Sequence, residues 1–146
     1  MPDPAKNKEL VRQVIEQIYN QGNLQMIDQL ISPQHTGFDV GDPFYQSHEP
    51  TYQHNTDGIK QFVFIVHTLV PDIHYTIDDI MAEGDNVLLR WTARGTLTGN
   101  AASISGTGQP VEVMGMSRIT VGSDGTCNRL ETFSNLQEVA GQLGLS

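Results

Sequence analysis

The chain has 146 residues, 38% of them hydrophobic and 17% charged, which suits one domain with a real core. Its net charge of −9 excludes a general nucleic-acid binder, which needs Lys and Arg to displace phosphate counterions, and disfavours anionic membranes. We expect a cytoplasmic protein with no membrane partner, because neither a secretory signal nor a membrane-length apolar run is visible and the single cysteine, Cys127, allows no intrachain disulfide.

The N-terminal part of the chain predicts two helices. Apolar residues recur at helical spacing over 7–20, and Gly22 can end this helix with a left-handed cap. Asn23 is then expected to cap a short second helix, which Pro33 stops.

Residues 34–57 lack any periodicity, and a loop of this length in a small domain is often a binding loop or lid. After it, an apolar stripe that includes Phe62 predicts a helix over 58–70, capped by Thr56 or Asp57.

The second half predicts strands, because it is rich in β-branched and aromatic residues and carries two tight-turn sequences, Glu83–Asn86 and Gly122–Gly125. We expect antiparallel strands over 73–83, 86–97, 111–121 and 127–135, followed by a last helix over 136–143. Helices followed by such a meander predict a single α+β domain over 1–146.

Several short stretches resemble one family in their order and spacing. They are Tyr19–Leu24, Pro71–Asp79, Ala82–Asp85, Arg90–Thr96, Thr107–Gly108, Asp124–Gly125 and Gln142–Gly144. The chain resembles the SnoaL-like polyketide cyclases (ester cyclases), which are part of the nuclear-transport-factor-2-like (cystatin-like) superfamily. The resemblance implies a curved antiparallel sheet packed on N-terminal helices, forming a cone with a central pocket. It also implies cofactor-independent aldol ring closure, with an acid/base group beside a carbonyl.

The resemblance also indicates where the chemistry would lie, and this chain departs from it at two positions. The family's usual Asp at the end of the last strand matches Asn135, and a His common in the third strand matches Ser117. Neither residue titrates near pH 7, although both can hold an oxyanion by donating hydrogen bonds.

A substitute carboxylate is available on the last strand. If Asn135 faces the pocket, strand alternation places Phe133 and Glu131 there too, and Glu131 could act as general base or acid. The alternative is a Glu131 that reaches water or pairs with an Arg.

We expect Trp91, Phe133, Leu97 and Phe62 to form substrate-binding walls for a planar or apolar ligand, although the aromatic residues could simply fill the core. His54 or His48 could lie over the pocket as an acid/base group. With Glu49 these histidines lack the helical spacing of a zinc motif, so we expect no metal and no cofactor.

Two classes of function remain open. The chain is either a cyclase, isomerase or dehydratase acting on a carbonyl-bearing apolar molecule, or a non-catalytic binding protein on the same scaffold; a hydrolase with a pocket carboxylate is a weaker alternative. Met114, Met116 and Arg118 fall on the sheet face opposite the pocket, which would suit a homodimer or a higher homo-oligomer.

Overall fold

The computed structural model describes residues 2–40, 55–101 and 104–144. They form an α+β fold in which helices pack on one curved, open sheet, as expected. In chain order the elements are α1 (Pro4–Gln13), η1 (Val14–Asn20), α2 (Gln25–Leu30), β1 (Ile31–Asp39), α3 (Thr56–Leu69), β2 (His74–Glu83), β3 (Asn86–Leu97), β4 (Gln109–Val121), β5 (Cys127–Ser134) and α4 (Leu136–Gln142).

The first predicted helix is present, but its second half, η1, is a π-helix. Gly22 adopts φ +68°, as the left-handed cap requires. Two predicted caps are wrong. Helix α2 begins after Leu24 without a side-chain cap, and the Asn55 side chain caps α3 by accepting from the Gly58 N–H at 2.8 Å.

The sheet has five strands in the order β1-β5-β4-β3-β2. The four predicted strands are present with ends within two residues of those expected, and they pair antiparallel in chain order. The fifth strand, β1, was expected to belong to the second helix and the long loop. It pairs with β5 in parallel, with Asp39 opposite Thr132.

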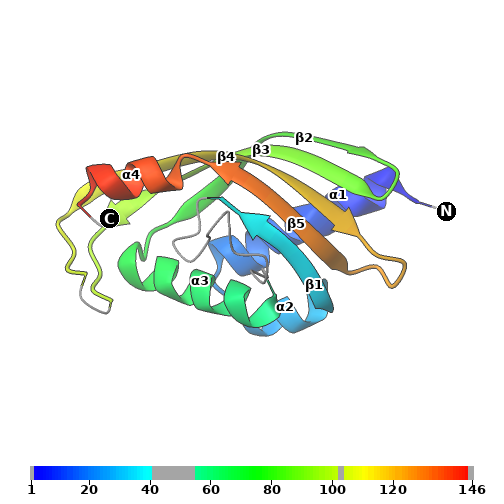
Figure 1. The fold of residues 1–146 in the computed structure, drawn as a ribbon, viewed down its shortest axis with the longest axis horizontal. Helices are drawn as coiled ribbons and strands as arrows, with labels where there is room; N and C mark the ends of the chain where they lie inside the picture. Colours follow the sequence, from blue (N-terminus) through cyan, green and yellow to red (C-terminus); the bar gives the residue numbers. More distant parts are fainter. Residues whose placement is uncertain (1, 41–54, 102–103, 145–146) are drawn as a thin grey trace.

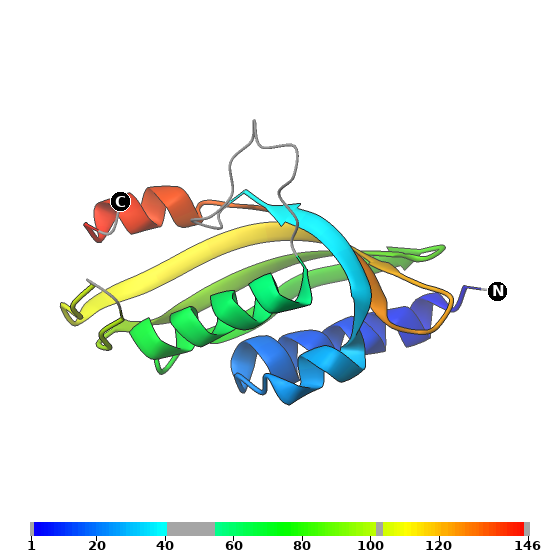
Figure 2. The same ribbon diagram turned by 60° about the horizontal axis from the view of Figure 1, so that its bottom comes forward.

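The sheet bends over the helices. Figures 1 and 2 show α3 and the N-terminal helices beneath its concave face, with α4 beyond the end of β5. The core lies between these layers and includes the fully buried side chains of Val11, Ile18, Ile27, Ile59, Val63, Val87 and Leu97. Among the described residues, the convex face exposes Met81, Leu88, Met114, Met116 and Phe133. Within the ranges given above, no helix is long and apolar enough to cross a bilayer.

Candidate active site

A pocket of about 150 Å³ lies between the concave face of the sheet, η1, α3 and α4. Its walls are mostly aliphatic and aromatic side chains, among them Val14, Tyr19, Phe62, Val66, Leu69, Tyr75, Trp91, Leu97, Val113, Leu136 and Val139. A concave apolar pocket with a few polar groups is the usual form of a small-molecule site.

Four of the candidate residues named from the sequence lie at this pocket: Trp91, Leu97, Phe62 and Ser117. Trp91 is buried, and its indole Nε1–H donates to Ser117 Oγ at 3.0 Å. The bond satisfies the polar end of the indole while its ring forms part of the wall. His54 and His48 fall outside the described residues, so their suggested positions over the pocket remain predictions.

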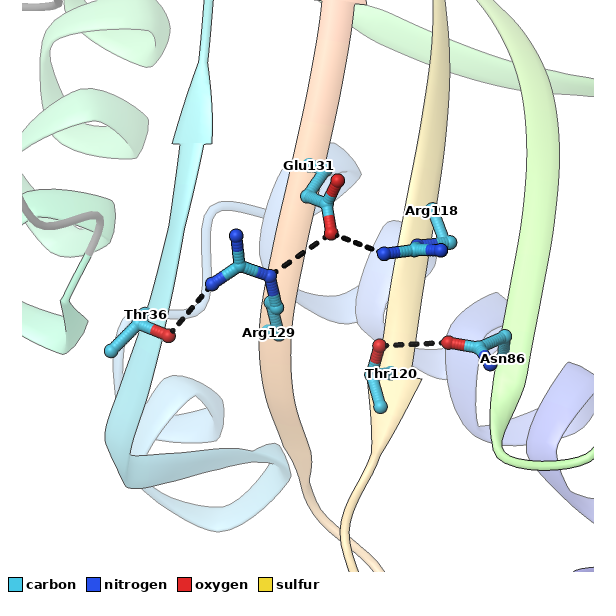
Figure 3. A network of polar contacts seen from close by, with 6 residues as sticks. All are labelled: Thr36, Asn86, Arg118, Thr120, Arg129 and Glu131. Carbon is cyan, nitrogen blue, oxygen red and sulfur yellow. Dashed lines mark hydrogen bonds and ion pairs between the residues drawn. The ribbon is translucent and has the colours of Figure 1, made fainter.

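The expected orientation of Glu131 and Phe133 is wrong, because both side chains lie on the convex face. Figure 3 shows Glu131 between two arginines; its Oε1 accepts from Arg118 Nη2 at 2.6 Å and from Arg129 Nε at 2.9 Å. These hydrogen bonds hold the pKa of the Glu131 carboxyl below its usual value. Phe133 is 59% exposed and contacts Phe38 edge-on, with ring centroids 5.4 Å apart.

The error has a local cause at Asn135. Strand β5 ends at Ser134, and Asn135 adopts φ −94° and ψ 22°, so the two-residue alternation does not extend to it. Asn135 precedes α4, and its side-chain oxygen accepts from the Met114 N–H at 2.9 Å. Asn135 is not among the residues that line the pocket.

The other face of β5 meets the pocket through Leu130, Thr132 and Ser134. Thr132 is only 3% exposed, and its Oγ1 lies 2.8 Å from Ser117 Oγ. Thr132 therefore joins Ser117 in a buried pair of hydroxyl groups.

Two titratable residues that the sequence analysis did not single out lie at the pocket, both on β1. His35 is 3% exposed and Asp39 9% exposed, and both line the pocket. They share one strand face with Gly37, while Thr36 and Phe38 point to the other face; Thr36 accepts a hydrogen bond there from Arg129. Asp39 is four residue steps, roughly 13 Å of extended strand, away from His35, so the two side chains serve different parts of the pocket.

Tyr75 adds an aromatic, neutral surface close to Asp39. Its ring stands 5.5 Å from Tyr19 and 5.4 Å from Trp91, centroid to centroid. Burial, and secondarily the negative charge of Asp39, raise the pKa of the Tyr75 phenol. Tyr75 is therefore a neutral O–H group at working pH.

The register of the sheet puts the polar groups of the pocket in one row. Asp39 is the Cα partner of Thr132 across β1 and β5, and Thr132 is the partner of Ser117 across β5 and β4. Neighbouring strands are roughly 4.8 Å apart, so a carboxyl group and two hydroxyls occupy adjacent positions on one face. Such a row can exchange a proton at one end and hold a charged oxygen at the other. The described residues include no cluster of three His, Cys, Asp or Glu that could hold a metal ion.

Comparisons with known proteins identify the family and the fold. The model of the SnoaL-like polyketide cyclase family matches residues 9–129. Among solved structures, the chain is similar to AclR, a candidate hydroxylase from Streptomyces galilaeus (TM-score 0.78, 21% identity, covering 99% of this chain and 88% of that one). It is also similar to IdmH, a candidate polyketide cyclase from Streptomyces antibioticus (TM-score 0.78, 25% identity, 94% and 98%).

A protein from Catenulispora acidiphila, described as having a ketosteroid isomerase-like fold and solved with trimethylamine, is similar at TM-score 0.69 and 17% identity, covering 94% of each chain. These likenesses place the chain in the expected nuclear-transport-factor-2-like fold. No curated protein sequence matches the chain.

Proposed function

Since the chain belongs to the SnoaL-like polyketide cyclase family, we propose that it is a cofactor-independent enzyme that moves a proton next to a carbonyl group of a largely apolar, planar molecule. The observation that carries the proposal is the buried carboxyl group of Asp39 in an apolar pocket, in register with two hydroxyl groups. Asp39 takes the role that the sequence suggested for Glu131.

The proposed reaction begins with the Asp39 carboxylate removing a proton from the carbon beside the ligand's carbonyl group. The electron pair of that C–H bond moves into the new C–C double bond, and negative charge develops on the carbonyl oxygen. Ser117, buried in the same row, stabilises this oxygen through the hydroxyl pair it forms with Thr132. In a cyclase the enolate carbon then attacks a second carbonyl carbon, and the oxygen of that carbonyl takes the proton back from Asp39 as its C=O double bond becomes a single bond. In an isomerase Asp39 returns the proton to another carbon instead.

A specific observation favours the binding-protein alternative. The two positions where the family usually places its titratable groups hold Asn135 and Ser117, and Asn135 uses its side-chain oxygen on the backbone of β4. A chain that has lost proton chemistry would keep the apolar walls and the hydroxyl pair but would leave its ligand unchanged.

The two functions are separated by screening planar aromatic ketones and esters with thermal shift and native mass spectrometry, then following turnover of each ligand that binds. If the chain is an enzyme, Asp39→Asn should remove turnover and retain binding. Glu131→Gln, a matched change on the convex face, should retain both turnover and binding. Ligands that bind the wild type and are never converted would support the binding protein.

We further propose that the convex face binds a second copy of the chain. Besides five exposed apolar side chains, it carries four arginines and five acidic residues: Arg90, Arg94, Arg118 and Arg129, and Asp78, Asp79, Glu83, Glu112 and Glu131. Four positive and five negative charges leave this face with a net charge of −1, so −8 of the chain's net charge of −9 belongs to the rest of the molecule. Two such acidic chains therefore repel each other far less at this face than elsewhere, and Met, Phe and Arg are enriched at protein interfaces.

Sedimentation velocity tests the dimer. Met116→Glu should give a monomer, whereas Phe64→Glu, a matched change at an exposed position on α3, should leave the dimer intact. A wild-type chain that sediments as a monomer would contradict the proposal.

A further inference from the structure

We infer that the hydroxyl group of Thr132 is the direct hydrogen-bond donor to a carbonyl oxygen of the ligand, and that Trp91 and Ser117 orient it. The inference rests on the proposed function, because it concerns the same pocket. It adds Thr132, a residue that the sequence analysis did not single out.

The three groups form a buried chain of hydrogen bonds. The indole Nε1–H of Trp91 lies 3.0 Å from Ser117 Oγ, and that oxygen lies 2.8 Å from Thr132 Oγ1. All three residues are buried and line the pocket. An indole nitrogen can only donate, so Ser117 must accept from Trp91.

Counting hydrogens shows what the chain presents to a ligand. Ser117 and Thr132 have two hydroxyl hydrogens between them, and their mutual bond uses one. Either hydroxyl could donate in that bond. We assign the direction in which the bonds run head to tail and polarise one another, with Ser117 donating to Thr132 and the remaining hydrogen on Thr132. Within residues 2–40, 55–101 and 104–144, neither hydroxyl has a further hydrogen-bond partner.

A buried hydroxyl hydrogen without an acceptor is costly, so a ligand oxygen placed there gains a hydrogen bond. The strand register also fixes where the ligand's carbonyl group would lie, because Thr132 has Asp39 as its partner on one side and Ser117 on the other. A carbonyl oxygen held by Thr132 therefore places its neighbouring carbon beside Asp39. The site should distinguish a ketone from an analogue of the same shape that has CH₂ in place of the carbonyl.

The test uses α-tetralone and tetralin, which share a carbon skeleton and differ in the carbonyl oxygen. Relative to the wild type, Thr132→Val should lower the preference for α-tetralone over tetralin by roughly three- to tenfold in the ratio of their Kd values. Thr132→Ser keeps the hydroxyl and should keep the preference. Thr120→Val is the matched control, because the Thr120 hydroxyl donates to Asn86 away from the pocket (Figure 3). This change should leave the preference for α-tetralone unaltered.

The single Trp gives a second readout, because one indole N–H resonance reports the first bond of the chain. Ser117→Ala should shift that resonance in the ligand-free protein, and α-tetralone should shift it in the wild type but not in Thr132→Val. An unchanged Kd ratio in Thr132→Val would overturn this inference while leaving the proposed function intact. Failure of the wild type to bind either compound would overturn both.

Discussion

Asp39 and Thr132 are register partners in the parallel pair of β1 and β5, and both are buried against the same pocket. This relationship brings the carboxyl group beside the hydroxyl pair that Thr132 forms with Ser117. Because pairing with β5 fixes where Asp39 lies, changes that disturb β1 should affect the chemistry as well as the stability.

The first prediction concerns the backbone of β1 at Gly37. A Cβ built on Gly37 would lie 1.8 Å from the carbonyl oxygen of Leu130, and its φ of +142° is strained for any L side chain. Gly37→Ala should therefore destabilise the fold by more than about 3 kcal/mol. Gly84→Ala, in the turn between β2 and β3 at φ +58° with nothing within 4 Å, should cost only about 1 kcal/mol. Chemical denaturation measures both; equal losses would contradict the tight β1–β5 contact.

Gly115 is predicted to control the position of Trp91. A Cβ on Gly115 would come within 2.3 Å of Cζ2 of the indole ring, so Gly115→Ala must displace the ring from its bond with Ser117. We expect a loss of about 1–3 kcal/mol in stability, weaker α-tetralone binding and a shift in tryptophan emission. Unaltered emission and binding would show that Trp91 is not held against this strand.

The ion-pair group of Glu131 makes a prediction about pH. Its pKa is lowered in the folded protein by hydrogen bonds from Arg118 and Arg129, so the carboxylate contributes stability above its unfolded pKa, near 4.5, and loses it as the pH falls through the folded pKa. Glu131→Gln should thus be less stable than the wild type by about 0.5–1 kcal/mol at pH 7. The difference should shrink below pH 4.5 in thermal denaturation, and a difference that grew there would contradict the assigned pairing.

Cys127 is predicted to be unreactive in the native state. It is 1% exposed, and burial raises the pKa of its thiol to about 12. Labelling with Ellman's reagent at mildly alkaline pH should therefore be slow and should follow unfolding of β5. Rapid labelling of the native protein would mean that the thiol is accessible, contrary to its buried position.

Much of the sheet was predictable from the sequence because its signals are local. The β2–β3 and β4–β5 hairpins have β-branched strands joined by tight turns that contain Gly84 and Gly125, both at positive φ. Helix α3 is likewise marked by its apolar stripe. Only the capping residue was wrong there, because Asn55 immediately precedes the two candidates and can make the same type of bond.

The site was harder to predict, because its polar residues interrupt the alternation of apolar and polar residues that marks a half-buried strand. On β1, the inward positions include His35 and Asp39 where a strand normally has apolar residues, so the segment resembles a loop. Its partner in the sheet, β5, is far away in the sequence and pairs in parallel, which no local turn can indicate. On β5 the alternation was counted from Asn135, one residue past the strand end, and this reversed the predicted faces of Glu131 and Phe133.

The most direct test of the central claim is deuterium exchange into β-tetralone, monitored by NMR in heavy water. The carbon between the aromatic ring and the carbonyl group of this ketone loses a proton readily. The wild type and Glu131→Gln should accelerate exchange above the buffer rate, and Asp39→Asn should return it to that rate while still binding the ketone. Acceleration that persists in Asp39→Asn would show that another group takes the proton and would contradict the role assigned to Asp39.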